Sequence, residues 1–96
     1  MPFLTTATVY RFRGEWESVP AVYGVLNSKR QLIFIGQTDD MHREMAALDT
    51  DDSHCIHRFG PSLVWMEVLK EGEAARAARL RQLVADYPGV PCNRGG

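Results

Sequence analysis

Two apolar segments separated by a short polar stretch constrain the fold of this chain most. Ala21 to Leu26 and Gln31 to Ile35 are apolar almost throughout, and Asn27-Ser28-Lys29-Arg30 lies between them. Two such runs joined by a short polar turn predict a β-hairpin. Because neither run alternates with polar residues, both faces are expected to be covered, which places the hairpin near the centre of a sheet.

Two further strands are expected outside the hairpin. Ala7 to Arg13 alternates, with Tyr10 and Phe12 on one face and arginines on the other, as a half-buried strand does. Leu63 to Leu69 is a second candidate, and this strand would present Trp65, Glu67 and Leu69 on one face.

The rest of the chain has helical spacing. A helix capped by Thr38 or Asp39 is expected to carry one apolar stripe formed by Met41, Met45 and Leu48. A short helical piece from His54 to Phe59 should follow. Glu71 to Tyr87 is expected to be a second long helix. Its predicted apolar stripe is Ala77, Leu80, Leu83, Val84 and Tyr87, with Glu73, Arg76 and Arg79 on the other face. This order predicts an α/β (α+β) sandwich around a three- or four-stranded mixed or antiparallel sheet.

Length and charge restrict the function classes. Ninety-six residues suit one domain, residues 1–96, because a second would be too small to bury a core. The net charge is −1, so the chain lacks the excess positive charge of a domain that holds nucleic acid by phosphate contacts alone. Nine of the eleven basic residues are arginine, which favours bidentate contacts with carboxylate or phosphate.

Cysteine usage and hydropathy bear on compartment and metal binding. No apolar run is long enough to span a bilayer, and Met1 to Thr6 lacks the features of a secretory signal, so the cytoplasm is the expected compartment. Cys55 and Cys92 are therefore expected to be free thiols. The cluster His54-Cys55-Ile56-His57 lacks both a CxxC pair and an HxxxH spacing, and no metal site is predicted there.

Two short motifs lie on the predicted hairpin. Ala21-Val22-Tyr23 is on its first strand, and Phe34-Ile35-Gly36, followed by Gln37-Thr38, is on its second. A helix follows, and the chain ends with Pro91-Cys92-Asn93. Together these features resemble the GIY-YIG nuclease family over residues 19–93. The resemblance implies that family's small α/β fold and metal-dependent phosphodiester hydrolysis, with Mg²⁺ or Mn²⁺ as the cofactor.

The residues that the family uses for chemistry are mostly replaced. Tyr23 and Asn93 match the family pattern, but Phe34 stands at the second tyrosine. Glu44 falls at the arginine position, with Arg43 beside it. The metal-binding glutamate aligns with Leu80, and no carboxylate lies between Glu73 and Asp86. Without a carboxylate there, Mg²⁺ has no protein anchor.

Three hypotheses follow. The first is a catalytically degenerate GIY-YIG-like domain that acts as a binding or interaction module, with a protein as the candidate partner, no cofactor and no membrane association. The second is an active, divergent nuclease that uses Tyr23, Arg43 and a carboxylate such as Glu44 or Glu73. The third is a nucleic-acid binder without catalysis. The binding-pocket candidates are Phe34, Gly36, Gln37, Thr38, His42 and Asn93, and the candidates for phosphate or partner contacts are Arg76 and Arg79.

Overall fold

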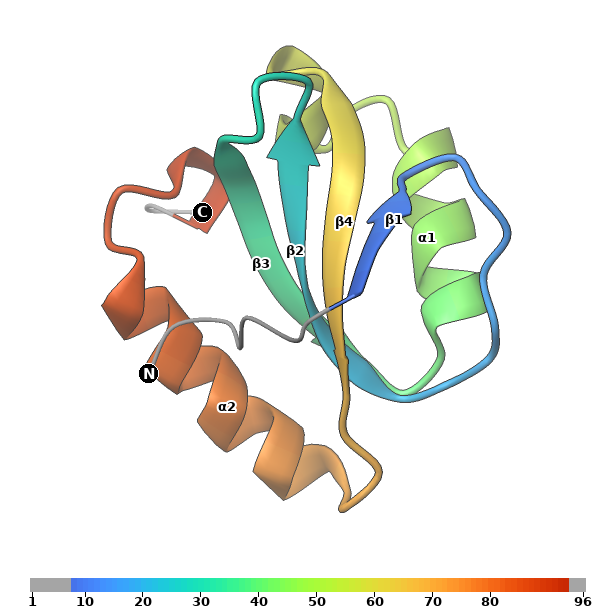
Figure 1. Ribbon diagram of the computed structural model, residues 1–96, viewed down its shortest axis with the longest axis vertical. Helices are drawn as coiled ribbons and strands as arrows, with labels where there is room; N and C mark the ends of the chain where they lie inside the picture. The colour runs from blue at the N-terminus through green and yellow to red at the C-terminus, as the bar shows by residue number, and fades with distance from the viewer. Residues whose placement is uncertain (1–7, 94–96) are drawn as a thin grey trace.

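One antiparallel sheet of four strands forms the centre of the molecule (Figure 1). The computed structural model describes residues 8–93. The strands are β1 (Thr8–Arg11), β2 (Ala21–Asn27), β3 (Leu32–Thr38) and β4 (Pro61–Val68), in the order β1-β4-β2-β3. The helices are α1 (Met41–Thr50) and α2 (Glu73–Asp86), with two 3₁₀ turns, η1 (Cys55–Arg58) and η2 (Pro91–Asn93). The predicted α+β sandwich is confirmed.

Strand β2 occupies the position that its sequence predicts. It pairs with β3 on one side and β4 on the other, and residues 21–26 are all buried. Its hairpin partner β3, by contrast, lies at the edge of the sheet. The side chain of Asn93 covers part of that edge: its Oδ1 accepts a hydrogen bond from the Ile35 amide at 2.7 Å, and its Nδ2 donates to the Ile35 carbonyl at 2.9 Å. The side-chain amide thereby substitutes for a neighbouring strand.

The sheet divides the interior into two cores, because α1 and α2 pack on opposite faces. On the α1 face, Met41, Met45 and Leu48 pack with Tyr23 and other buried residues of the sheet, which confirms the predicted stripe. On the α2 face the buried residues are Val22, Ile35, Leu83 and Val90. Within residues 8–93, neither helix combines the length and apolar content needed to cross a membrane.

The prediction of two free thiols is wrong. Cys55 of η1 and Cys92 of η2 form a disulfide, with their Cα atoms 5.6 Å apart. The two residues are 37 positions apart in sequence, so only the folded chain reveals that both 3₁₀ turns lie at the same end of the sheet. The bond ties the segment that carries Asn93 to the α1 side of the molecule.

The placement of Arg76 and Arg79 on the helix face away from the apolar stripe is also wrong. Arg76 is only 8% exposed, and the Arg79 side chain is 14% exposed. Arg76 precedes Leu80 by four residues and Leu83 by seven, and this spacing places all three on one face of a helix. The apolar stripe of α2 therefore extends through the arginines, which reach polar groups at the margin of the sheet.

Candidate functional site

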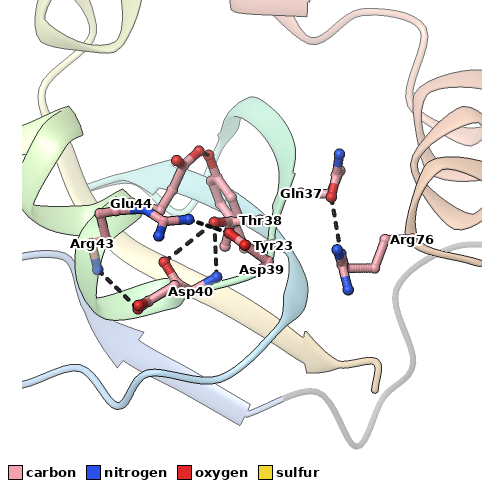
Figure 2. Close-up of polar contacts among 8 residues, drawn as sticks. All are labelled: Tyr23, Gln37, Thr38, Asp39, Asp40, Arg43, Glu44 and Arg76. Atoms are coloured by element: carbon pink, nitrogen blue, oxygen red, sulfur yellow. Dashed lines mark hydrogen bonds and ion pairs between the residues drawn. The ribbon is translucent and has the colours of Figure 1, made fainter. Parts of the chain in front are cut away.

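Tyr23, the tyrosine of the first motif, is completely buried on the central strand. Its hydroxyl donates a hydrogen bond to Oε2 of Glu44 on α1, at 2.6 Å (Figure 2). A hydroxyl that donates to a carboxylate at this distance is a strong, charge-assisted interaction. The contact joins β2 to α1 at the position where the family resemblance places an arginine.

Gly36 allows the Tyr23 ring to occupy this position. The two residues are cross-strand partners in the β2–β3 ladder. A Cβ atom on Gly36 would lie 2.5 Å from the Tyr23 hydroxyl oxygen and 2.7 Å from Cζ, closer than atoms can approach. Phe34, two residues before Gly36, packs against two rings. Its ring centroid lies 6.1 Å from that of Tyr23 and 4.9 Å from that of His54, which it meets edge-on. The second motif thus supplies a glycine for clearance and an aromatic wall.

The environment of Tyr23 keeps its phenol neutral. Burial raises the pKa of Tyr23 far above its usual value, and the negative charge of Glu44 and the hydrogen bond to it raise this pKa further. A tyrosine in this state keeps its proton, donates a hydrogen bond and is not available as a base. A tyrosine that activates a nucleophile must instead accept a proton, which requires a lowered pKa.

A polar cleft of about 340 Å³ opens beside this pair. Its walls are the end of β3, the start of α1 and the first turns of α2, and its lining residues are Gln37, Thr38, Asp39, Arg43, Glu44, Glu73 and Arg76. We call this space the β3–α1–α2 cleft. It contains three carboxylates and two guanidinium groups, and Arg43 forms an ion pair with Asp39 (Figure 2). Arg76 enters from the other side and donates from Nε to Oε1 of Gln37 at 3.1 Å.

The turn between β3 and α1 is fixed by local hydrogen bonds. The Asp40 amide donates to the Thr38 hydroxyl at 3.1 Å, and that hydroxyl donates to the Asp40 carbonyl at 3.2 Å. Asp40, and not Thr38 or Asp39 as predicted, caps α1, because its Oδ1 accepts from the Arg43 amide at 3.1 Å. That hydrogen bond is the main reason why the pKa of Asp40 is lowered. The cap sets the position from which Arg43 and Glu44 enter the cleft.

The structure separates the residues that the sequence grouped as one pocket. Gln37 and Thr38 line the cleft, and Gly36 lies beneath the Tyr23 ring. His42 instead lines a different hollow, of about 530 Å³, beside Trp16. Asn93 lines neither space, and its side-chain amide is hydrogen-bonded to the Ile35 backbone at the β3 edge.

The sequence identifies four of the five charged residues of the cleft as candidates, Arg43, Glu44, Glu73 and Arg76, but it does not group Arg76 with the others. Leu80, which the family resemblance aligns with a metal-binding glutamate, packs in the α2-face core, and Arg76 lines the cleft one turn earlier. Asp39, a predicted helix cap, instead pairs with Arg43 and lines the cleft. The spacing of Arg76 from the apolar stripe of α2 indicates its burial, whereas no sequence pattern predicts that Glu73 and Glu44 line the same cleft.

Metal ligands do not converge in the described part of the chain. Within residues 8–93, no three His, Cys, Asp or Glu side chains are placed to hold one ion. His54 accepts a hydrogen bond at Nδ1 from the Ile56 amide at 3.2 Å and caps η1, while Nε2 of His57 lies 2.8 Å from the Leu48 carbonyl oxygen. Both histidines therefore have structural partners.

The sequence was compared with protein-family models and with curated proteins, and it matches none of either.

Proposed function

We propose that this chain is a GIY-YIG-like domain whose catalytic centre has degenerated and which acts as a binding or interaction module. The observation that carries the proposal is the hydrogen bond from Tyr23 to Glu44. It joins the one motif tyrosine that survives to a carboxylate, at the position where the family resemblance calls for a cation.

Two consequences oppose phosphodiester cleavage. The Tyr23 hydroxyl, with its raised pKa and its hydrogen bond already donated to Glu44, cannot accept a proton from an attacking nucleophile. Glu44 also brings negative charge to the place where a phosphate would accumulate charge in the transition state, and repulsion there raises the barrier. Arg43 does not offset this, because it is paired with Asp39.

One arrangement favours the alternative of a divergent metal-dependent endonuclease. Glu44 and Glu73, which come from different helices, line the same cleft as Arg43, and Glu44 accepts the hydrogen bond from Tyr23. Two carboxylates plus substrate oxygens are what Mg²⁺ or Mn²⁺ would require. The third hypothesis, a nucleic-acid binder that uses Arg76 and Arg79, has less support, because Arg79 forms a bidentate pair with Glu67 at 2.8 and 2.9 Å.

A plasmid-nicking assay with Mg²⁺ and with Mn²⁺ separates the first two. We expect wild type and Tyr23→Phe to give the same background, since the hydroxyl has no catalytic role. Cleavage by wild type that disappears in both Tyr23→Phe and Glu73→Gln would establish the nuclease instead. Arg81→Gln, an exposed change on the same helix, is the matched control for surface charge.

The proposed partner class is a protein or a small ligand. The net charge of −1 gives no general attraction to nucleic acid. The cytoplasmic location expected from the sequence stays a prediction, and the Cys55–Cys92 bond weighs against it, because disulfides are rare in reducing compartments.

A further inference from the structure

Two arginines one turn apart on α2 have different partners. The Arg79 guanidinium is bound by both oxygens of Glu67, and this pairing raises the pKa of Arg79. Arg76 is more deeply buried, at 8% exposure, yet within residues 8–93 no carboxylate lies within ion-pair distance of it. Its one side-chain acceptor is neutral, the Gln37 amide oxygen. A buried cation normally has an anionic partner, because desolvation is costly without one.

Arg76 lines the β3–α1–α2 cleft, and its terminal nitrogens have no partner among residues 8–93. Every buried side-chain nitrogen and oxygen among the described residues has a hydrogen-bond partner. Nη1 and Nη2 of Arg76 have no acceptor in residues 8–93, and Arg76 is one of the residues that line the cleft. Gln37 accepts through Oε1, which directs its Nε2 donor away from Arg76 (Figure 2). This side of the cleft therefore presents hydrogen-bond donors.

The remaining charges of the cleft are acidic. Glu44 uses Oε2 to accept from Tyr23, and Glu73 lines the cleft from the first turn of α2. Because Asp39 is paired with Arg43, the cleft has two further negative charges, on Glu44 and Glu73, and one further positive charge, on Arg76. A ligand with several negative charges would be repelled. A ligand that carries one carboxylate and one cationic group would satisfy both sides.

We infer that the cleft binds a small zwitterion, with its carboxylate on the Nη1–Nη2 end of Arg76 and its cationic group toward Glu44 and Glu73. The planar guanidinium fork matches a carboxylate with two parallel hydrogen bonds. A volume of about 340 Å³ lies in the range of small-molecule sites. The inference rests on the proposed binding function and names the ligand class.

The test is a titration of the ¹⁵N-labelled chain with 6-aminohexanoate, followed by the backbone amide signals. Hexanoate, which lacks the cationic group, and inorganic phosphate are the comparison probes. We expect saturable shifts at Gln37, Thr38 and neighbouring amides with 6-aminohexanoate, and weaker binding of both comparison probes. Arg76→Met should weaken binding about tenfold or more, as expected for loss of a charged hydrogen-bond pair. Arg81→Met should leave it unchanged, because Arg81 is exposed on the same helix.

Several results would overturn the inference. They are the absence of saturable binding, shifts that map to the hollow beside Trp16, equal binding by Arg76→Met, or phosphate binding as tightly as 6-aminohexanoate. If Arg76→Met does not fold, Arg76→Lys keeps the charge without the planar fork and should bind less tightly than wild type. These readouts need no cleavage activity, so their failure is distinct from failure of the nicking test.

Discussion

Replacing Gly36 with alanine tests how the two motifs fit together. The new Cβ would lie 2.5 Å from the Tyr23 hydroxyl oxygen, 2.7 Å from its Cζ and 3.0 Å from Cε2 of Phe34. Ordinary contact begins at 3.4 Å, so the Tyr23 ring must retreat by about 1 Å. The ring has little room to do so, because it is fully buried and its hydroxyl is bonded to Glu44.

The expected cost is set by overpacking. Inserting a methyl group into a filled core costs about 1–3 kcal/mol, and the tethered ring places Gly36→Ala near the upper end. Reduced freedom of the unfolded chain returns about 0.5 kcal/mol, which leaves a net loss of about 2 kcal/mol. For a domain of this size the loss corresponds to a Tm lower by roughly 8–16 °C. Urea denaturation, followed by circular dichroism, measures this loss in the free energy of unfolding.

A double-mutant cycle makes the prediction specific. In a Tyr23→Phe background the closest atom is gone and the ring is no longer tethered, so the cost of Gly36→Ala should fall by about 1 kcal/mol. Gly89→Ala is the matched control and should be close to neutral, since within residues 8–93 no atom beyond its chain neighbours lies within 4 Å of its Cβ position. The reasoning is refuted if Gly36→Ala matches wild type, or if its cost is the same in both backgrounds.

Three other changes test the supports around the site. Cys55→Ser opens a loop between residues 37 apart and should lower the free energy of unfolding in urea by about 4 kcal/mol. Reductant should lower the stability of wild type by the same amount and leave the variant unchanged. Arg79→Met removes the bidentate partner of the mostly buried Glu67, and we expect a loss of about 3 kcal/mol, whereas a loss below 1 kcal/mol would show that the pair is solvated. Asn93→Ala removes both side-chain hydrogen bonds to the β3 edge and should lower the free energy of unfolding by about 2 kcal/mol. Hydrogen exchange of the Ile35 amide should become faster, and an unchanged exchange rate would contradict this role.

Local patterns in the sequence predict most of the fold. The apolar hairpin, the Met41–Met45–Leu48 stripe and the helix in residues 73–86 are all observed, because each depends on spacing within one element. The disulfide depends on two 3₁₀ turns meeting across the fold, and no local pattern contains that information. The edge position of β3 was missed for a similar reason: its apolar run is covered by α2 and by Asn93 and not by a further strand.

The candidate site was predictable only in part. Tyr23, Gly36, Gln37 and Thr38 were found because the motif itself identifies them. The hydrogen bond from Tyr23 to Glu44 and the burial of Arg76 depend on where each helix crosses the sheet. Arg76 shows why. Its polarity predicts a surface position, whereas its helical spacing from Leu80 and Leu83 predicts a buried one, and the structure follows the spacing.

The ionisation of Tyr23 tests the central claim most directly. The raised pKa means that folding favours the neutral phenol, so its contribution to stability is fully present below about pH 10, the usual tyrosine value, and is lost as the pH rises further. The ¹³Cζ chemical shift of Tyr23, followed against pH, reports this proton alone. We predict that the signal stays at its neutral position through pH 10 and changes only as the chain unfolds. Ionisation of Tyr23 in the folded chain near neutral pH would contradict the account, because such a tyrosine would be able to act as a base.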